Sequence, residues 1–126
     1  MSISITEHHD RNQILVVVSG AMTMKEMMNF ISTHRSGDHR GYAFLFDVSA
    51  ATATLSGNEM RQLAAHAADE SRKSPMGAVA FISSDPYAYG LGRMYQSYSA
   101  AEGRKNVGVF RTMAEAQNWL AHLKSS

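Results

Sequence analysis

The sequence contains no cysteine, so disulfide bonds, thiolate catalysis and sulfur-ligated zinc are all excluded. It also lacks an excess of one charge, because 12 Lys and Arg stand against 11 Asp and Glu and leave a net charge of +1. The basic residues are scattered along the chain rather than gathered on one expected element. This distribution argues against a nucleic-acid partner.

Long apolar runs are absent as well. The longest uninterrupted aliphatic run, from Ile14 to Val18, is too short to cross a bilayer. The first residues, MSISITEHHD, lack a basic region followed by the apolar stretch of a targeting segment. We therefore expect one cytoplasmic domain over residues 1–126 that does not insert into a membrane.

Several segments have the pattern of β-strands. Residues 2–8 alternate in polarity, and a turn leads from them into an apolar segment at 13–20, which predicts an N-terminal hairpin. The segments 13–20, 42–48 and 77–82 are apolar at successive positions, as is typical of strands covered on both faces. A shorter segment at 106–111 contains a glycine and is expected near the edge of a sheet.

Between these strands lie segments of helical period, at about 24–34, 57–72, 85–102 and 113–124. Three of them open with a capping box, in which a hydroxyl residue is followed three positions later by glutamate. The pairs are Thr23 with Glu26, Ser56 with Glu59, and Thr112 with Glu115. The remaining helix opens with Asp85 as the expected N-cap and Pro86 in the first helical position.

The predicted order of elements is therefore β-β-α-β-α-β-α-β-α. Because crossover helices make the later strands parallel, this order predicts an α/β fold with an open, mixed, mostly parallel sheet and helices on both faces. Binding sites in such sheets gather beyond the carboxyl ends of the strands. Four polar residues are expected at this edge and form the predicted partner-binding surface: Asp47, Ser49, Ser56 and Asp85.

Catalytic chemistry has little support at this edge. A serine nucleophile needs a histidine nearby, and none of the six histidines lies in these loops. The histidines also lack a paired metal-ligand spacing, and the two glycine-containing segments lack the spacing of a phosphate loop. We therefore expect a protein that is not an enzyme, with no catalytic residue, no metal and no cofactor.

The segment YAYGLGRMYQSY gives the third helix an unusual composition. Helical spacing places four of its larger side chains on one face: Tyr87, Leu91, Met94 and Tyr98. Gly90 and Gly92 cost about 1 kcal/mol each relative to alanine inside a helix. Two interpretations remain open: this face packs against the sheet, or it lies beside a small apolar ligand. The ligand interpretation involves Met22, Tyr87, Leu91, Met94, Tyr95 and Tyr98.

The order of elements, the entry QILVVVSGAMT, the strand FLFDVS and the closing VFRTMAEAQNWL resemble the STAS or SpoIIAA-like fold over essentially the whole chain. More closely, the sequence is similar to small bacterial SpoIIAA-like proteins. In the anti-sigma-factor antagonists of this fold, phosphorylation of a serine before a glycine at the second helix controls binding to a partner kinase. Asp47 matches the strand-ending acid of that pattern and Ser56-Gly57 the serine and glycine, whereas the residues around them depart from it.

Two functions follow as expectations. The first is a non-enzymatic protein-interaction or regulatory module that binds an unidentified protein through the Asp47–Ser56 loop and the adjoining helix starts. Ser56 is there either a helix cap alone or a phosphoacceptor. The alternative is a carrier of a small apolar ligand or lipid, with a pocket beside the helix at 85–102. The exposed edge strand of the N-terminal hairpin is also compatible with pairing to a second copy of the chain, which would form a homodimer.

Overall fold

The computed structural model describes residues 2–34, 41–52, 54–74 and 77–125. The described elements follow the predicted order, and their strands form one five-stranded sheet. The strands are β1 (Ser2–His8), β2 (Gln13–Ala21), β3 (Ala43–Thr52), β4 (Val79–Ile82) and β5 (Val107–Phe110). The helices are α1 (Met24–His34), α2 (Gly57–Lys73), α3 (Pro86–Ala101) and α4 (Met113–Ser125).

The sheet has the order β1-β2-β3-β4-β5, with β1 antiparallel to β2 and all other neighbours parallel. This arrangement confirms the predicted open mixed sheet. It arises because β1 and β2 are joined by a short turn, whereas every later pair is joined through a helix. The carboxyl ends of β2, β3, β4 and β5 therefore meet at one edge, which we call the carboxyl edge.

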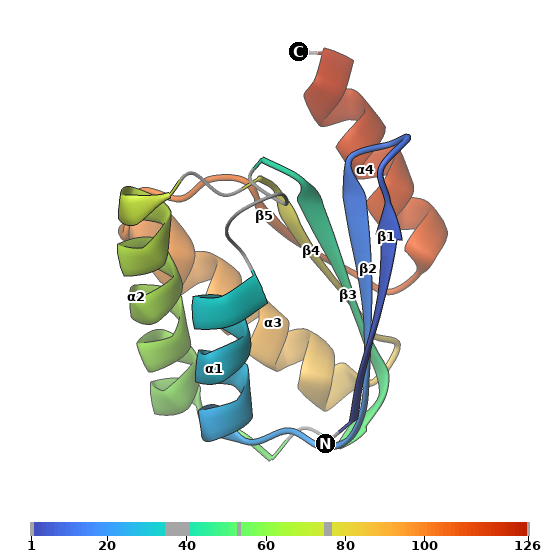
Figure 1. Ribbon diagram of the computed structural model, residues 1–126. Helices are drawn as coiled ribbons and strands as arrows, with labels where there is room; N and C mark the ends of the chain where they lie inside the picture. Colours follow the sequence, from blue (N-terminus) through green and yellow to red (C-terminus); the bar gives the residue numbers. More distant parts are fainter. Residues whose placement is uncertain (1, 35–40, 53, 75–76, 126) are drawn as a thin grey trace.

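Helices cover both faces of the sheet, as predicted. In Figure 1, α1, α2 and α3 lie on one face, whereas α4 lies on the other. The large core cluster lies under the three helices and contains Phe44 and Phe46 of β3. The smaller cluster lies under α4 and contains Leu45 of the same strand. The alternation along β3 explains why its sequence is apolar at successive positions.

The third strand is longer than the sequence predicts. The prediction ended it at residue 48, whereas β3 continues to Thr52. Its final residues pair with the end of β2. The register shifts between these two strands, because Val17 pairs with Asp47, whereas Ser19, two residues later, pairs with Ala50, three residues later. Most of the predicted Asp47–Ser56 loop is therefore strand, and Asp47 lies within β3 rather than at its end.

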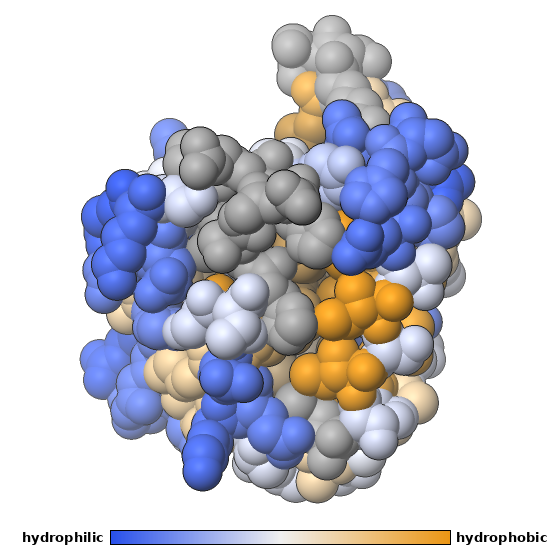
Figure 2. All heavy atoms as spheres, in the orientation of Figure 1, coloured by the Kyte–Doolittle hydropathy of each residue, from blue (hydrophilic) through white to orange (hydrophobic). Residues whose placement is uncertain are grey.

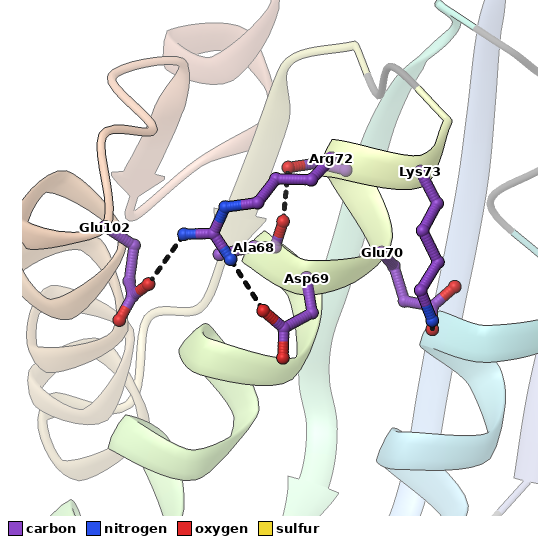
Figure 3. Close-up of polar contacts among 7 residues, drawn as sticks. Ala68, Asp69, Glu70, Arg72, Lys73 and Glu102 are labelled. Carbon is purple, nitrogen blue, oxygen red and sulfur yellow. Dashed lines mark hydrogen bonds and ion pairs between the residues drawn. The ribbon is translucent and has the colours of Figure 1, made fainter.

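The ends of α2 and α3 that lie away from the carboxyl edge are joined by an ion pair. Figure 3 shows that Arg72 of α2 reaches both Asp69 on the same helix and Glu102 at the end of α3. The Nη2 atom of Arg72 lies 3.0 Å from Oε1 of Glu102. The side chains are largely exposed, so each pair contributes at most about 1 kcal/mol, and the pair between Arg72 and Glu102 joins the two helix ends.

The chain also reverses sharply at the end of α3. Gly103 has a φ of 93°, a left-handed conformation that glycine adopts without strain. The amide of Gly103 donates to the carbonyl of Ala100, and the amide of Arg104 donates to that of Ser99. These bonds satisfy the last helical carbonyls and direct the chain into β5.

Within the described residues, no helix is long and apolar enough to cross a membrane.

Candidate functional site

The parallel register brings the predicted polar residues to the same end of the sheet. Asp47 of β3 pairs with Ile82, the last residue of β4, and Ile82 pairs with Phe110, the last residue of β5. Asp85 therefore follows the end of β4 by a few residues, at the same edge as Asp47. Residues far apart in the sequence meet at the carboxyl edge, as predicted.

Ser56 forms a complete capping box at the start of α2. Its hydroxyl oxygen accepts from the amide of Glu59 at 3.2 Å, and the Glu59 carboxylate accepts from the amide of Ser56 at 2.8 Å. The residue is exposed. The structure thus assigns Ser56 a capping function, which leaves its hydroxyl accessible at the surface.

Asp47 and Ser49 lie within β3 and not in the segment that enters α2. Asp47 alternates along β3 with the buried Phe46 and Val48, which belong to the core under α1, α2 and α3. Its side chain therefore points to the face that carries α4. One of its carboxylate oxygens accepts from the amide of Ser49 at 3.0 Å, close to the register shift. The described contacts of Asp47 are thus local ones that support the irregular end of β3.

Asp85 caps α3, as predicted. Its carboxylate accepts from the amide of Ala88 at 2.9 Å, and Pro86 occupies the first turn of the helix. Ser83, which the partner-binding prediction did not include, is buried just before this cap, and its hydroxyl accepts from the amide of Asp85 at 3.1 Å. β3 and β4 are neighbours, but the carboxylates of Asp47 and Asp85 each bond to a backbone amide near them in the chain.

The buried face of α3 differs from the one expected from its large side chains. Tyr87 and Met94 are 55% and 38% exposed, whereas Tyr95 is buried. The residues that face the sheet include three small ones, and together they are Ala88, Leu91, Gly92, Tyr95 and Ser99. Tyr98 is partly buried against the same core. Leu91 belongs to both the expected face and the observed one.

Tyr87 and Met94 lie against the segment that enters α2. The Tyr87 hydroxyl donates to the carbonyl of Leu55 at 3.0 Å. Met94 contacts Gly57, where a Cβ atom would overlap the terminal methyl group of the methionine. Tyr87 and Met94 are seven residues apart and therefore lie on the same side of α3. We call the surface formed by Ser56, Gly57, Tyr87 and Met94 the α2–α3 patch.

The α2–α3 patch stands out because large apolar side chains are seldom this exposed in the described part of the chain. Four of them are exposed there, and two of the four belong to this patch. Leu55 itself is buried and anchors the segment, whereas the neighbouring Ser56 is exposed. The sequence predicted Ser56 and Tyr87 as site residues for different functions, but not that they lie together.

A cavity of about 50 Å³ lies between the sheet and the helices α1, α2 and α3. Its lining is apolar except for a few groups such as Ser83, and it includes Met22, Leu91 and Tyr95 from the predicted ligand-binding set. Tyr87, Met94 and Tyr98 of that set do not line it. The cavity is about one third of the volume of an engineered protein cavity that binds benzene, about 150 Å³.

Two of the histidines contact polar side chains of other segments of the fold. His9 lies 2.8 Å from the Tyr42 hydroxyl and from a Glu7 carboxylate oxygen, and His66 lies 2.8 Å from the hydroxyl of Ser32. Throughout the described residues, no three side chains of the types that bind metal ions form a group. His39, one of the six, lies outside the described residues.

A scan of the chain against protein-family models finds no match, and a search of curated proteins also finds none.

Proposed function

We propose that the protein is a non-enzymatic interaction module of the STAS or SpoIIAA-like type that binds a protein partner through the α2–α3 patch. The observation that carries this proposal is the exposure of Tyr87 and Met94 beside an exposed helix cap. Aromatic and methionine side chains are enriched at protein interfaces, where they bury large areas. The element order and the mixed sheet support the family resemblance.

The location of the patch also supports this proposal. It lies at the carboxyl edge, where the loops of a mostly parallel sheet present residues from several strands and helices. Tyr87 is held by its bond to Leu55, and the entry to α2 is held by the capping box. A surface that is already ordered loses little conformational entropy when a partner binds.

Substitutions in the patch are expected to weaken partner binding at least about tenfold, which corresponds to about 1.4 kcal/mol. The variants are Tyr87→Ala and Met94→Ala, with Leu123→Ala as the matched control, because Leu123 is also exposed but lies on α4. The measurement is the quantity of each protein captured by the immobilised domain from a lysate. Equal capture by all the variants and the unsubstituted domain would contradict the proposal.

Two substitutions of Ser56 test regulation at the same patch. Ser56→Asp keeps a capping side chain and adds a negative charge beside Glu59, whereas Ser56→Ala removes the cap at a cost of about 1 kcal/mol. If phosphorylation at Ser56 controls binding, Ser56→Asp changes the captured quantity while Ser56→Ala does not. The same capture by both variants would assign Ser56 a capping role alone.

The cavity favours a second candidate function, the binding of a small apolar ligand. Its apolar lining and its position under α3 suit an apolar molecule, and Met22 and Met60 in its lining are flexible enough to adapt. At about 50 Å³ the space suits a very small molecule, whereas a lipid chain would require α3 to move. Native mass spectrometry of the freshly purified protein tests this candidate. We expect a copurified apolar ligand that is lost in Ala88→Leu, which fills the cavity; its absence from the unsubstituted protein would contradict the candidate.

A further inference from the structure

The two edges of the sheet are protected to different degrees. β5 has only four residues, and the amide of the Gln96 side chain on α3 donates to the carbonyl of Val107 at 3.0 Å. The amide of Val79 bonds to the carbonyl of Asn106, so the backbone groups of Val107 point away from β4. Gln96 therefore occupies a hydrogen-bonding position on the outer edge of β5, where another strand would otherwise pair.

The opposite edge is formed by β1, which has seven residues and pairs only with β2 in the described sheet. The amide of Ala43 bonds to the carbonyl of Asn12, so Ile14 and Val16 direct their backbone groups toward β3. The residues between them, such as Leu15 and Val17, therefore direct their backbone groups toward β1. There they bond to the even-numbered residues of β1, such as Thr6 and Ser4. It follows that the amides and carbonyls of Ile3 and Ile5 point outward from the sheet.

The side chains of β1 do not discourage pairing. Natural edge strands are usually blocked by charged side chains, above all lysine, by proline or by a bulge. Ser2–His8 contains no lysine or proline and pairs with β2 in an uninterrupted register, and its one charged residue, Glu7, lies outside residues 2–6. Ile3 and Ile5 lie on the face of the sheet that carries α1, and Ile5 is 38% exposed. Figure 2 shows hydrophobic side chains at the surface between α1 and the β1 edge.

We propose that β1 pairs antiparallel with β1 of a second copy of this chain, which joins two sheets into one. A two-fold axis between the Ser4 residues of the two copies places Ile3 of each copy opposite Ile5 of the other. Both residues have outward-facing backbone groups, so each pair exchanges two hydrogen bonds. The four isoleucines then form one apolar cluster, and no like charges lie opposite each other within residues 2–6.

The second copy fits this edge because the pairing is self-complementary. A two-fold interface requires the same segment to serve as both partners, and the alternation of Ser2–Thr6 satisfies this requirement on both faces of the strand. One strand pair buries a small area, so we expect a dimer that dissociates on dilution. The β1 edge and the α2–α3 patch involve different elements, so the failure of either proposal leaves the other intact.

Cysteine cross-linking tests the pairing directly, because the chain has no cysteine of its own. In the proposed register the two Ser4 residues form a non-hydrogen-bonded pair with Cα atoms about 4.5 Å apart, a separation that a disulfide spans. The two Thr6 residues lie about 13 Å apart along the strands. Under mild oxidation, we expect Ser4→Cys to form a covalent dimer at least about tenfold faster than Thr6→Cys. Both residues are exposed, so random collisions would cross-link the two variants equally.

Sedimentation over a roughly hundredfold range of concentration provides the second measurement. We expect the unsubstituted protein to dimerise as concentration rises and Ile5→Lys to remain a monomer, because lysine blocks an edge strand. Leu123→Lys is the matched control, since Leu123 has the same 38% exposure but lies on α4. Circular dichroism verifies that each variant is folded.

Three results would overturn the proposed pairing. The first is a monomer at every concentration. The second is a dimer that Ile5→Lys and Leu123→Lys weaken equally, which would place the interface elsewhere. The third is equally fast cross-linking of Ser4→Cys and Thr6→Cys, because that result would show collision without a defined register.

Discussion

Phe44→Ala lowers the free energy of unfolding by an expected 3–5 kcal/mol, about the loss that follows truncation of a buried phenylalanine. Phe44 lies in β3, the central strand, and only 2% of it is exposed. Its ring is perpendicular to that of Phe30 and stacked on that of Phe46, with centroid distances of 6.3 Å and 6.1 Å. The substitution thus removes apolar area and the contacts that join α1 to the sheet.

Urea unfolding followed by circular dichroism measures this effect. Phe44→Leu is the matched control, because it retains most of the apolar volume and should lose less than Phe44→Ala. A loss below about 1 kcal/mol for Phe44→Ala would show that α1 does not depend on this side chain for its packing.

The two glycines inside α3 are expected to respond in opposite directions to the same substitution. Gly90 is exposed, and a Cβ atom there would meet nothing within 4 Å. Gly90→Ala should therefore raise the free energy of unfolding by about 0.5–1 kcal/mol through helix propensity alone. At Gly92 a Cβ atom would lie 2.9 Å from Cγ1 of Val109 on β5. Because valine is stiff and this contact is buried, Gly92→Ala should lower the free energy by about 1–3 kcal/mol.

Thermal unfolding of the two variants measures this difference, and each variant is the control for the other. The pair separates close packing from helix propensity, since the amino-acid change and the helix are the same. Stabilisation by Gly92→Ala would mean that α3 can move away from β5 at little cost, and this result would contradict the close approach.

The boundaries of most helices could be predicted from the sequence because their starting signals are local. Ser56 and Asp85 each bond to a backbone amide three residues later, so the signal depends on short-range geometry alone. The buried face of α3 could not be predicted in this way. The stripe beginning at Tyr87 and the observed face share Leu91, and the observed face contains Ala88, Gly92 and Ser99, whose small side chains carry little hydrophobic signal.

The end of β3 was missed for a related reason. Ser49 to Thr52 are small or polar and lack the apolar pattern of a strand, yet the last three of them pair with the end of β2. The register shift near Asp47 also interrupts the alternation on which such a prediction depends. Long-range pairing decides the conformation of these residues, and it leaves no periodic pattern in the sequence itself.

The α2–α3 patch was only partly predictable. Ser56 could be placed at the carboxyl edge because the strands are parallel, but the contact between Tyr87 and Leu55 depends on how α3 packs beside α2. That packing is set by Gly92 against β5 and by Gly57 against Met94, two close approaches that no local pattern reveals. The sequence therefore predicts the edge at which a site lies more readily than the side chains that form it.

The cavity beneath α3 has a consequence for the response of the protein to hydrostatic pressure. A void of about 50 Å³ in each molecule amounts to about 30 mL per mole, within the range of volume decreases that accompany the unfolding of globular proteins. Compression thus favours states in which water fills this space. A molecule that occupied the void would make the domain more resistant to pressure.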